Sequence, residues 1–119
     1  MVKRFHDRSV DRLRRAYKIG VTLAFGSDLI FYAPDETRGT WTMSLIDVFV
    51  EAEIPPKDIL QALIPNAARL LGVEKARGAI SPGQFADIIA VPENPLDNIS
   101  TLKKVNFVMK NGRVFKQAK

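Results

Sequence analysis

The sequence predicts an α/β fold in which a helical half comes first and a β half follows. Up to about residue 72, apolar residues recur at spacings of three and four, as on the buried stripe of amphipathic helices. From residue 78 onward, turn-forming residues separate short apolar runs, which is typical of strands. Val21–Phe25 is a continuous apolar run, and such a run is typical of a strand that is buried on both faces in a parallel sheet.

The first helix is predicted over residues 8–18, where Val10, Leu13 and Tyr17 share one face and charged residues lie between them. Gly20 stands where this helix should end, because glycine adopts the backbone conformation that follows a helix C-terminus. The predicted strand Val21–Phe25 comes next.

The second helix is predicted from Thr40 to near Ala52, after a long loop over residues 29–39. Residues 56–72 then read as two short helices that are separated at Pro65, with Gly72 at the end of the second. The residues expected on the buried face of this pair are Ile59, Leu60, Leu63, Leu70 and Leu71.

The β half contains a predicted turn at Ser81–Gly83 and a predicted strand over Ile88–Val91. Asn111–Gly112 lies between two short alternating runs, which is a strong indication of a β-hairpin.

The composition is that of a globular chain with one core: it has 119 residues, of which 46% are hydrophobic and 26% charged. No apolar run approaches the roughly 18 residues of a membrane helix, so we expect no membrane partner. Because there is no cysteine, disulfides, thiolate zinc sites and cysteine nucleophiles are excluded. A reducing compartment fits this composition, and we expect a cytoplasmic protein.

The net charge of +5 is concentrated in residues 1–18, which hold seven basic and two acidic side chains. This segment could bind phosphate or could simply be the solvated face of a helix. No aromatic stacking platform or nucleic-acid motif accompanies it, so we favour the solvated face and do not expect nucleic acid as a partner.

The stretch Val21–Asp28, VTLAFGSD, raises the question of chemistry, because its apolar run stops at a glycine, a hydroxyl and a carboxylate. Asp28 could cap a helix, form part of a turn or act as a catalytic acid. A carboxylate at a strand end can bind a cation and accept a proton from a metal-bound water. The local pattern alone leaves these three interpretations open.

Four motifs follow Asp28 in order. They are Asn-Ala-Ala-x-x-Leu-Gly at Asn66–Gly72, Gly-x-Ile-x-Pro-Gly-x-x-Ala-Asp at Gly78–Asp87, Asn-Pro-Leu at Asn94–Leu96, and Val108–Val114 with Lys-Asn-Gly inside it. Together with Phe-Gly-Ser-Asp, this order resembles the C-terminal segment of the amidohydrolase superfamily, in particular the imidazolonepropionase-like metal-dependent hydrolases. The resemblance covers about residues 10–117.

The resemblance implies the C-terminal fragment of a metal-dependent hydrolase (β/α)8 TIM barrel, with its last helix–strand unit and following helices in residues 1–76. Residues 77–119 would supply C-terminal strands of a composite β-sandwich domain. Asp28 matches a ligand of a divalent metal, zinc in our expectation, and the base that deprotonates the hydrolytic water. The implied substrates are small molecules with amide or cyclic amide carbon–nitrogen bonds. Ser27, Gly78, Gly83 and Asp87 match positions with a structural role.

The sequence departs from the superfamily because His6 is its single histidine and it contains no His-x-His. One carboxylate does not make a catalytic zinc site, which usually has three protein ligands, so we expect the chain to be inactive by itself and His6 to be a surface residue. The alternative is a non-catalytic remnant that acts as an oligomeric or binding module, with a homo-oligomer replacing lost contacts. Arg38 and Tyr32 could meet a substrate, although a solvated loop is the simpler interpretation.

Overall fold

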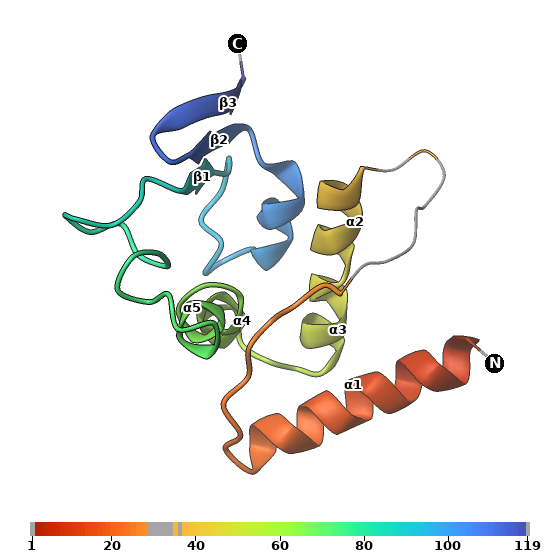
Figure 1. The fold of residues 1–119 in the computed structure, drawn as a ribbon. Coiled ribbons are helices and arrows are strands. Elements are labelled where there is room, and N and C mark those ends of the chain that lie inside the picture. The colour runs from red at the N-terminus through yellow and green to blue at the C-terminus, as the bar shows by residue number, and fades with distance from the viewer. Residues whose placement is uncertain (1, 29–34, 36, 119) are drawn as a thin grey trace.

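A computed structural model describes residues 2–28, 35 and 37–118, and it places the helical half before a small sheet (Figure 1). The predicted loop over residues 29–39 falls mostly outside the described residues. The helices are α1 (Val2–Lys18), α2 (Arg38–Ser44), α3 (Ile46–Glu51), α4 (Pro56–Leu63), α5 (Pro65–Leu70) and the 3₁₀ helix η1 (Ile99–Lys104). The strands are β1 (Ile88–Ala90), β2 (Phe107–Lys110) and β3 (Arg113–Gln117).

Helix α1 confirms the first predicted helix and begins six residues earlier than the predicted start at residue 8. Its C-terminus ends as predicted at Gly20, which has a φ of +80°. The N–H of Gly20 donates to the carbonyl of Tyr17 and that of Val21 to the carbonyl of Ala16, so the last carbonyls of the helix are satisfied. Val10 is buried, and Tyr17 donates a hydrogen bond to Asp58 that ties α1 to α4.

The helix predicted from Thr40 is divided into α2 and α3 at Leu45. Its register is confirmed, because Ile46 and Phe49 are buried. Helix α3 ends at Glu51 with Ala52 as its C-cap, close to the predicted end near Ala52, and Glu53 follows with a φ of +63°. The N–H of Ile54 donates to the carbonyl of Phe49 and closes the end of the helix.

Helices α4 and α5 confirm the pair predicted over residues 56–72, and each begins at a proline. Ile59 is buried, whereas Leu70 and Leu71 are 77% and 74% exposed. The prediction that these two leucines are buried is therefore wrong for this chain. Ala68 is the buried residue of α5, and the face that carries the leucines has no covering element among the described residues.

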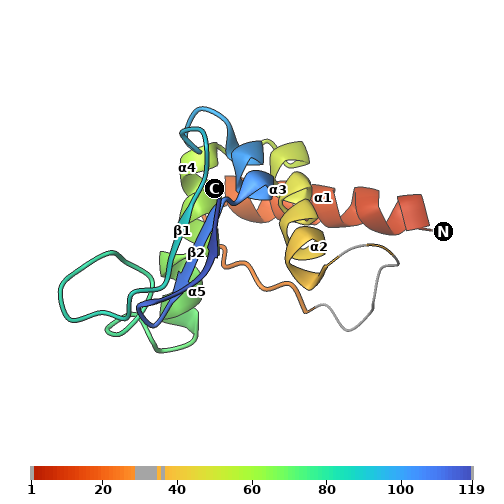
Figure 2. The same ribbon diagram turned by 90° about the horizontal axis from the view of Figure 1, so that it is seen from above.

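The β half forms one antiparallel sheet in the order β1-β2-β3. The hairpin at Asn111–Gly112 joins β2 to β3, and both of its residues have positive φ, as the sequence predicts. The predicted turn at Ser81–Gly83 is also present: Gln84 donates to the carbonyl of Ser81 and Gly83 has a φ of +85°. Figure 1 shows the sheet set apart from α4 and α5, and in the view from above in Figure 2 the strands overlap these two helices.

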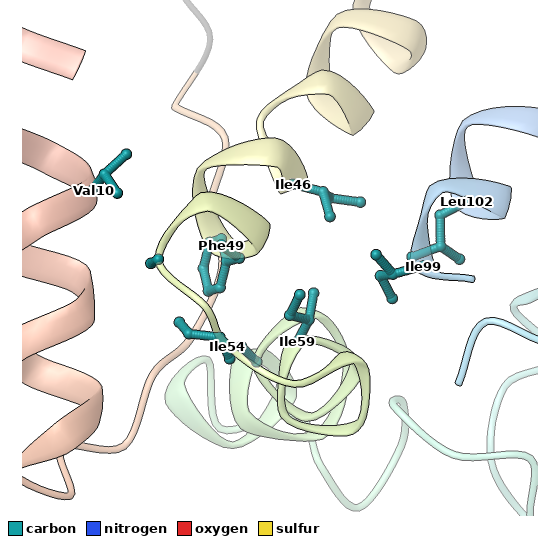
Figure 3. Packing of buried hydrophobic residues seen from close by; sticks show 9 residues of the cluster. Val10, Ile46, Phe49, Ile54, Ile59, Ile99 and Leu102 are labelled. Carbon is teal, nitrogen blue, oxygen red and sulfur yellow. The ribbon is translucent and has the colours of Figure 1, made fainter. Parts of the chain in front are cut away.

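The main core lies where α1, α3, α4 and η1 meet. Figure 3 shows the Ile59 side chain pointing toward Ile46 and Ile99. Thr101 of η1 has no exposed surface, and its hydroxyl accepts a hydrogen bond from the backbone N–H of Glu93. Among the described residues, no helix is long and apolar enough to cross a membrane.

The segment Val21–Phe25 is not a strand in this structure, so the prediction of a strand buried on both faces is wrong for this chain. Val21 is 49% exposed, and Leu23, Ala24 and Phe25 are only partly buried. A strand needs a neighbouring strand to satisfy its backbone groups. The three strands within the described ranges pair with one another, and none of them lies against this segment.

Candidate functional site

The candidate site is at the end of the segment that leads from α1 to Asp28. Two hydrogen bonds anchor this segment on the corner between α4 and α5. The side-chain amide of Asn66 donates to the carbonyl of Leu23 over 2.8 Å, and the N–H of Phe25 donates to the carbonyl of Ala62 over 2.9 Å. The ring of Phe25 also packs at a tilt against Phe49, with 5.9 Å between the centroids. These contacts fix the chain three residues before Asp28.

Asp28 is exposed and lines a pocket of about 290 Å³ together with Ser27, Arg38 and Thr42. Arg38 and Thr42 belong to α2, and Thr37 is the N-cap of this helix: its hydroxyl accepts a hydrogen bond from the N–H of Thr40. The pocket therefore lies between the end of the anchored segment and a capped helix.

The backbone of Asp28 has a φ of +42°, in the left-handed region that residues other than glycine, asparagine and aspartate rarely adopt. Aspartate tolerates this conformation because its short polar side chain can interact locally. Residues in such sparsely populated backbone conformations cluster at functional sites, which makes Asp28 a candidate for a functional residue.

The residues around the pocket do not by themselves fit a catalytic zinc ion. Asp28 is the carboxylate of the lining, and the lining also includes Arg38, whose side chain carries a positive charge. Across the described ranges, no three histidine, cysteine, aspartate or glutamate side chains lie close enough together to hold a metal ion. A catalytic zinc usually takes three protein ligands, so we derive no chemical step through a metal from this chain alone.

His6 lies in a different place, on α1, where its Nε2 is 2.7 Å from the carboxylate of Glu51 on α3. The hydrogen bond that the imidazole donates to Glu51, together with the charge of Glu51, raises the pKa of His6 above the usual value. The predicted surface position is confirmed, because the side chain is 41% exposed, and the structure adds its pairing with Glu51. His6 does not line the pocket of Asp28.

Asp87, the last residue of its motif, joins the preceding loop to the hairpin. Its carboxylate accepts a hydrogen bond from the N–H of Asn111 over 2.8 Å and pairs with Arg77. The bond from Asn111 lowers the pKa of Asp87 most, and Arg77 lowers it further. The guanidinium of Arg77 also lies 4.2 Å from the centroid of the Phe85 ring. These contacts support the structural role that we expected for Asp87.

The sequence identified Asp28, Ser27 and Arg38, which the structure brings to one pocket. Tyr32 lies outside the described residues. Two residues were missed: Thr42, which completes the pocket lining, and Asn66, which anchors the segment. The signal for Asn66 was its place directly after Pro65, inside a helix, where asparagine has no capping function and therefore needs another partner.

A second, larger hollow of about 770 Å³ lies between the α4–α5 pair and the sheet, and apolar side chains make up most of its lining. Ile64 and Ile80 border it and are 45% and 84% exposed. A solvent-exposed apolar surface of this kind is typical of a region that another polypeptide segment covers.

Comparisons with known proteins support the resemblance that the sequence motifs indicate. The profile of the amidohydrolase family matches residues 6–115 of this chain. Ochratoxinase from Aspergillus niger is 32% identical over 114 residues, which cover 92% of this chain and 22% of that enzyme.

Solved structures of related enzymes also superpose on this chain. A Xaa-Pro dipeptidase, solved with methionine in its active site, superposes with a TM-score of 0.78 and 36% identity, over 90% of this chain and 25% of the dipeptidase. A putative prolidase from Bifidobacterium longum superposes with a TM-score of 0.76 and 25% identity, over 92% of this chain and 27% of its own. The chain thus spans about a quarter of the length of these relatives.

Proposed function

Because this chain belongs to the amidohydrolase family, we propose that it is the C-terminal portion of a metal-dependent hydrolase that cleaves carbon–nitrogen bonds. The observation that carries the proposal is the position of Asp28, at the end of an anchored segment and open to a pocket. The order of the motifs after Asp28 supports the same assignment. In this proposal residues 1–76 belong to a TIM barrel and residues 77–119 to a β-sandwich domain.

Asp28 is the residue to which we assign chemistry. A carboxylate can both coordinate a divalent cation and accept a proton from a water molecule. We propose that it does so in a complete enzyme, where a divalent metal such as zinc would supply an activated water, and where ligands from outside this chain would complete the site. The 119 residues alone offer one such carboxylate at the pocket, so they are inactive by themselves in this proposal.

The proposed substrates are small molecules with amide or cyclic amide bonds. The 36% identical relative is a Xaa-Pro dipeptidase, so Xaa-Pro dipeptides belong in the substrate panel beside non-peptide amides. If dipeptides were turned over and the other amides were not, the substrate class would be narrowed to Xaa-Pro dipeptides.

The test is complementation. The Xaa-Pro dipeptidase is truncated to remove the quarter that this chain matches, mixed with the chain and zinc, and assayed for association and turnover. We expect turnover to return with the wild-type chain and to fall at least about 100-fold with Asp28→Asn, the usual loss for a missing general base. Asparagine also tolerates a positive φ, so the substitution removes the charge and spares the backbone.

The matched control is Asp35→Asn. Asp35 is exposed and has a φ of +66°, but it does not line the pocket, so its substitution should leave turnover unchanged. If turnover returned and Asp28→Asn were as active as wild type, the catalytic assignment would be wrong.

The alternative function is a non-catalytic remnant that acts as an oligomer or a binding module. The exposed Leu70 and Leu71 and the apolar hollow beside the sheet favour it, because they offer surface for association. The same complementation distinguishes the two: association of the chain with the truncated dipeptidase, without any turnover of the substrate panel, would favour the alternative.

A further inference from the structure

The segment before Asp28 depends on a small number of contacts for its direction. Within residues 22–28, the backbone bonds described are those of Leu23 with Asn66 and of Phe25 with Ala62. Among the strands in the described part of the chain, none pairs with this segment to supplement them. At Gly26 an added Cβ would meet no atom within 4 Å, so no close packing holds the chain at the residue directly after Phe25. The bonded anchor points closest to Asp28 are therefore at residues 23 and 25.

Asn66 is well placed to set this direction. It lies on α5, directly after Pro65, so its backbone is part of a helix with a proline-fixed start. Its Oδ1 accepts a hydrogen bond from Arg69 over 3.3 Å, while its Nδ2 donates to Leu23, so both ends of the amide have a partner. The donor is half-buried, and Leu23 is partly buried as well.

We propose that Asn66 is a positioning residue for Asp28, which it orients through the carbonyl of Leu23. The effect of Asn66 on catalysis rests on the proposed function. Its effect on the direction of residues 24–28 does not. A side chain that only stabilised the fold would lower the stability of the whole domain when lost. A positioning residue also changes the direction of residues 24–28 when lost, while the helices and the sheet stay as they are.

The test uses NMR spectroscopy on the 119-residue chain. Asn66→Asp keeps the shape and the acceptor for Arg69 but removes the donor to Leu23, and Asn66→Ala removes both. Residual dipolar couplings report the direction of each N–H bond, and hydrogen exchange reports how often the Phe25 amide opens. We expect the couplings of residues 24–28 to change in both variants and Phe25 exchange to accelerate about fivefold, the factor expected from one lost hydrogen bond.

The matched control is Asn98→Ala. Asn98 caps η1 by accepting from Ser100 and donates to Glu93, so its loss removes a cap of similar strength away from Asp28. We expect this variant to lose stability and to keep the couplings of residues 24–28. Unchanged couplings of residues 24–28 in both Asn66 variants would overturn the inference.

The complementation assay tests whether Asn66 affects catalysis. Asn66→Asp should lower kcat about tenfold or more with little change in KM, because a small displacement of a reacting group is costly to the rate. If Asp28→Asn abolishes turnover and Asn66→Asp leaves kcat unchanged, the positioning role is overturned although the proposed function stands. If Asp28→Asn has no effect, the proposed function fails, and changed couplings still support the structural part of the inference.

Discussion

Ile59 and Leu71 are two residues to which the sequence gives the same role and the structure gives opposite ones. Ile59 is 1% exposed and lies at the centre of the core, whereas Leu71 is 74% exposed. Replacing Ile59 with alanine removes three carbon atoms, each worth about 0.8 kcal/mol of transfer free energy. The cavity that remains adds to this cost, so we expect Ile59→Ala to lower the free energy of unfolding by about 3–4 kcal/mol.

Leu71→Ala is the matched control, because it removes the same number of carbons from a solvated position. We expect it to change the free energy of unfolding by less than about 0.5 kcal/mol. Since a loss of about 3–4 kcal/mol is a large part of the stability of an ordinary domain, Ile59→Val serves as a milder variant with an expected cost of about 0.5–1.5 kcal/mol. Urea unfolding followed by circular dichroism measures all three.

The comparison would refute the structural reasoning if Leu71→Ala were as destabilising as Ile59→Ala. That result would mean that the exposed face of α5 is covered in solution. Repeating the titrations at several protein concentrations identifies self-association, because a dimer gains stability with concentration and a monomer does not.

Three further outcomes are expected. Glu53 has a φ of +63° at a helix end where α1 has glycine, so Glu53→Gly should be more stable than Glu53→Ala by about 0.5–1 kcal/mol in urea unfolding. The pKa of Asp87 is lowered in the folded chain, so the ionised carboxylate stabilises the fold above about pH 4, and this stabilisation is lost as the pH falls through the folded pKa. Asp87→Asn should therefore make the melting temperature depend less on pH on the acid side. Thr101→Val should cost about 1–2 kcal/mol in urea unfolding, because the N–H of Glu93 loses its acceptor; an unchanged midpoint would show that water replaces the hydroxyl.

Helix ends and turns could be predicted from the sequence because they depend on local backbone preferences. Gly20 and Gly72 end helices with positive φ, and Asn111–Gly112 turns the hairpin. At each position a residue type that tolerates the left-handed region marks the place where the chain needs it. Neighbours in the sequence are sufficient to determine such features.

The strand predicted at Val21–Phe25 and the burial predicted for Leu70 and Leu71 failed for a different reason. Apolar patterning shows which faces avoid water, but it does not show what covers them. A strand exists only with a partner, and the described residues bring none to this segment. Thr42 could not be linked to Asp28 for the same reason, because their proximity depends on how α2 packs and not on their spacing in the sequence.

The placement of Asp28 and the completion of a catalytic site are separable properties of this chain. Asp28 is placed by contacts within the helical half: the segment before it is bound by α4 and α5, and the pocket in front of it is formed with α2. Residues of α4 and η1 form the core around Ile59, Met43 of α2 packs against it, and none of the contacts that place Asp28 involves a strand residue. Catalysis requires more ligands than this pocket supplies. A folded chain can therefore present Asp28 in the geometry described here without turning over a substrate, and for this reason the complementation assay and the NMR measurement answer different questions.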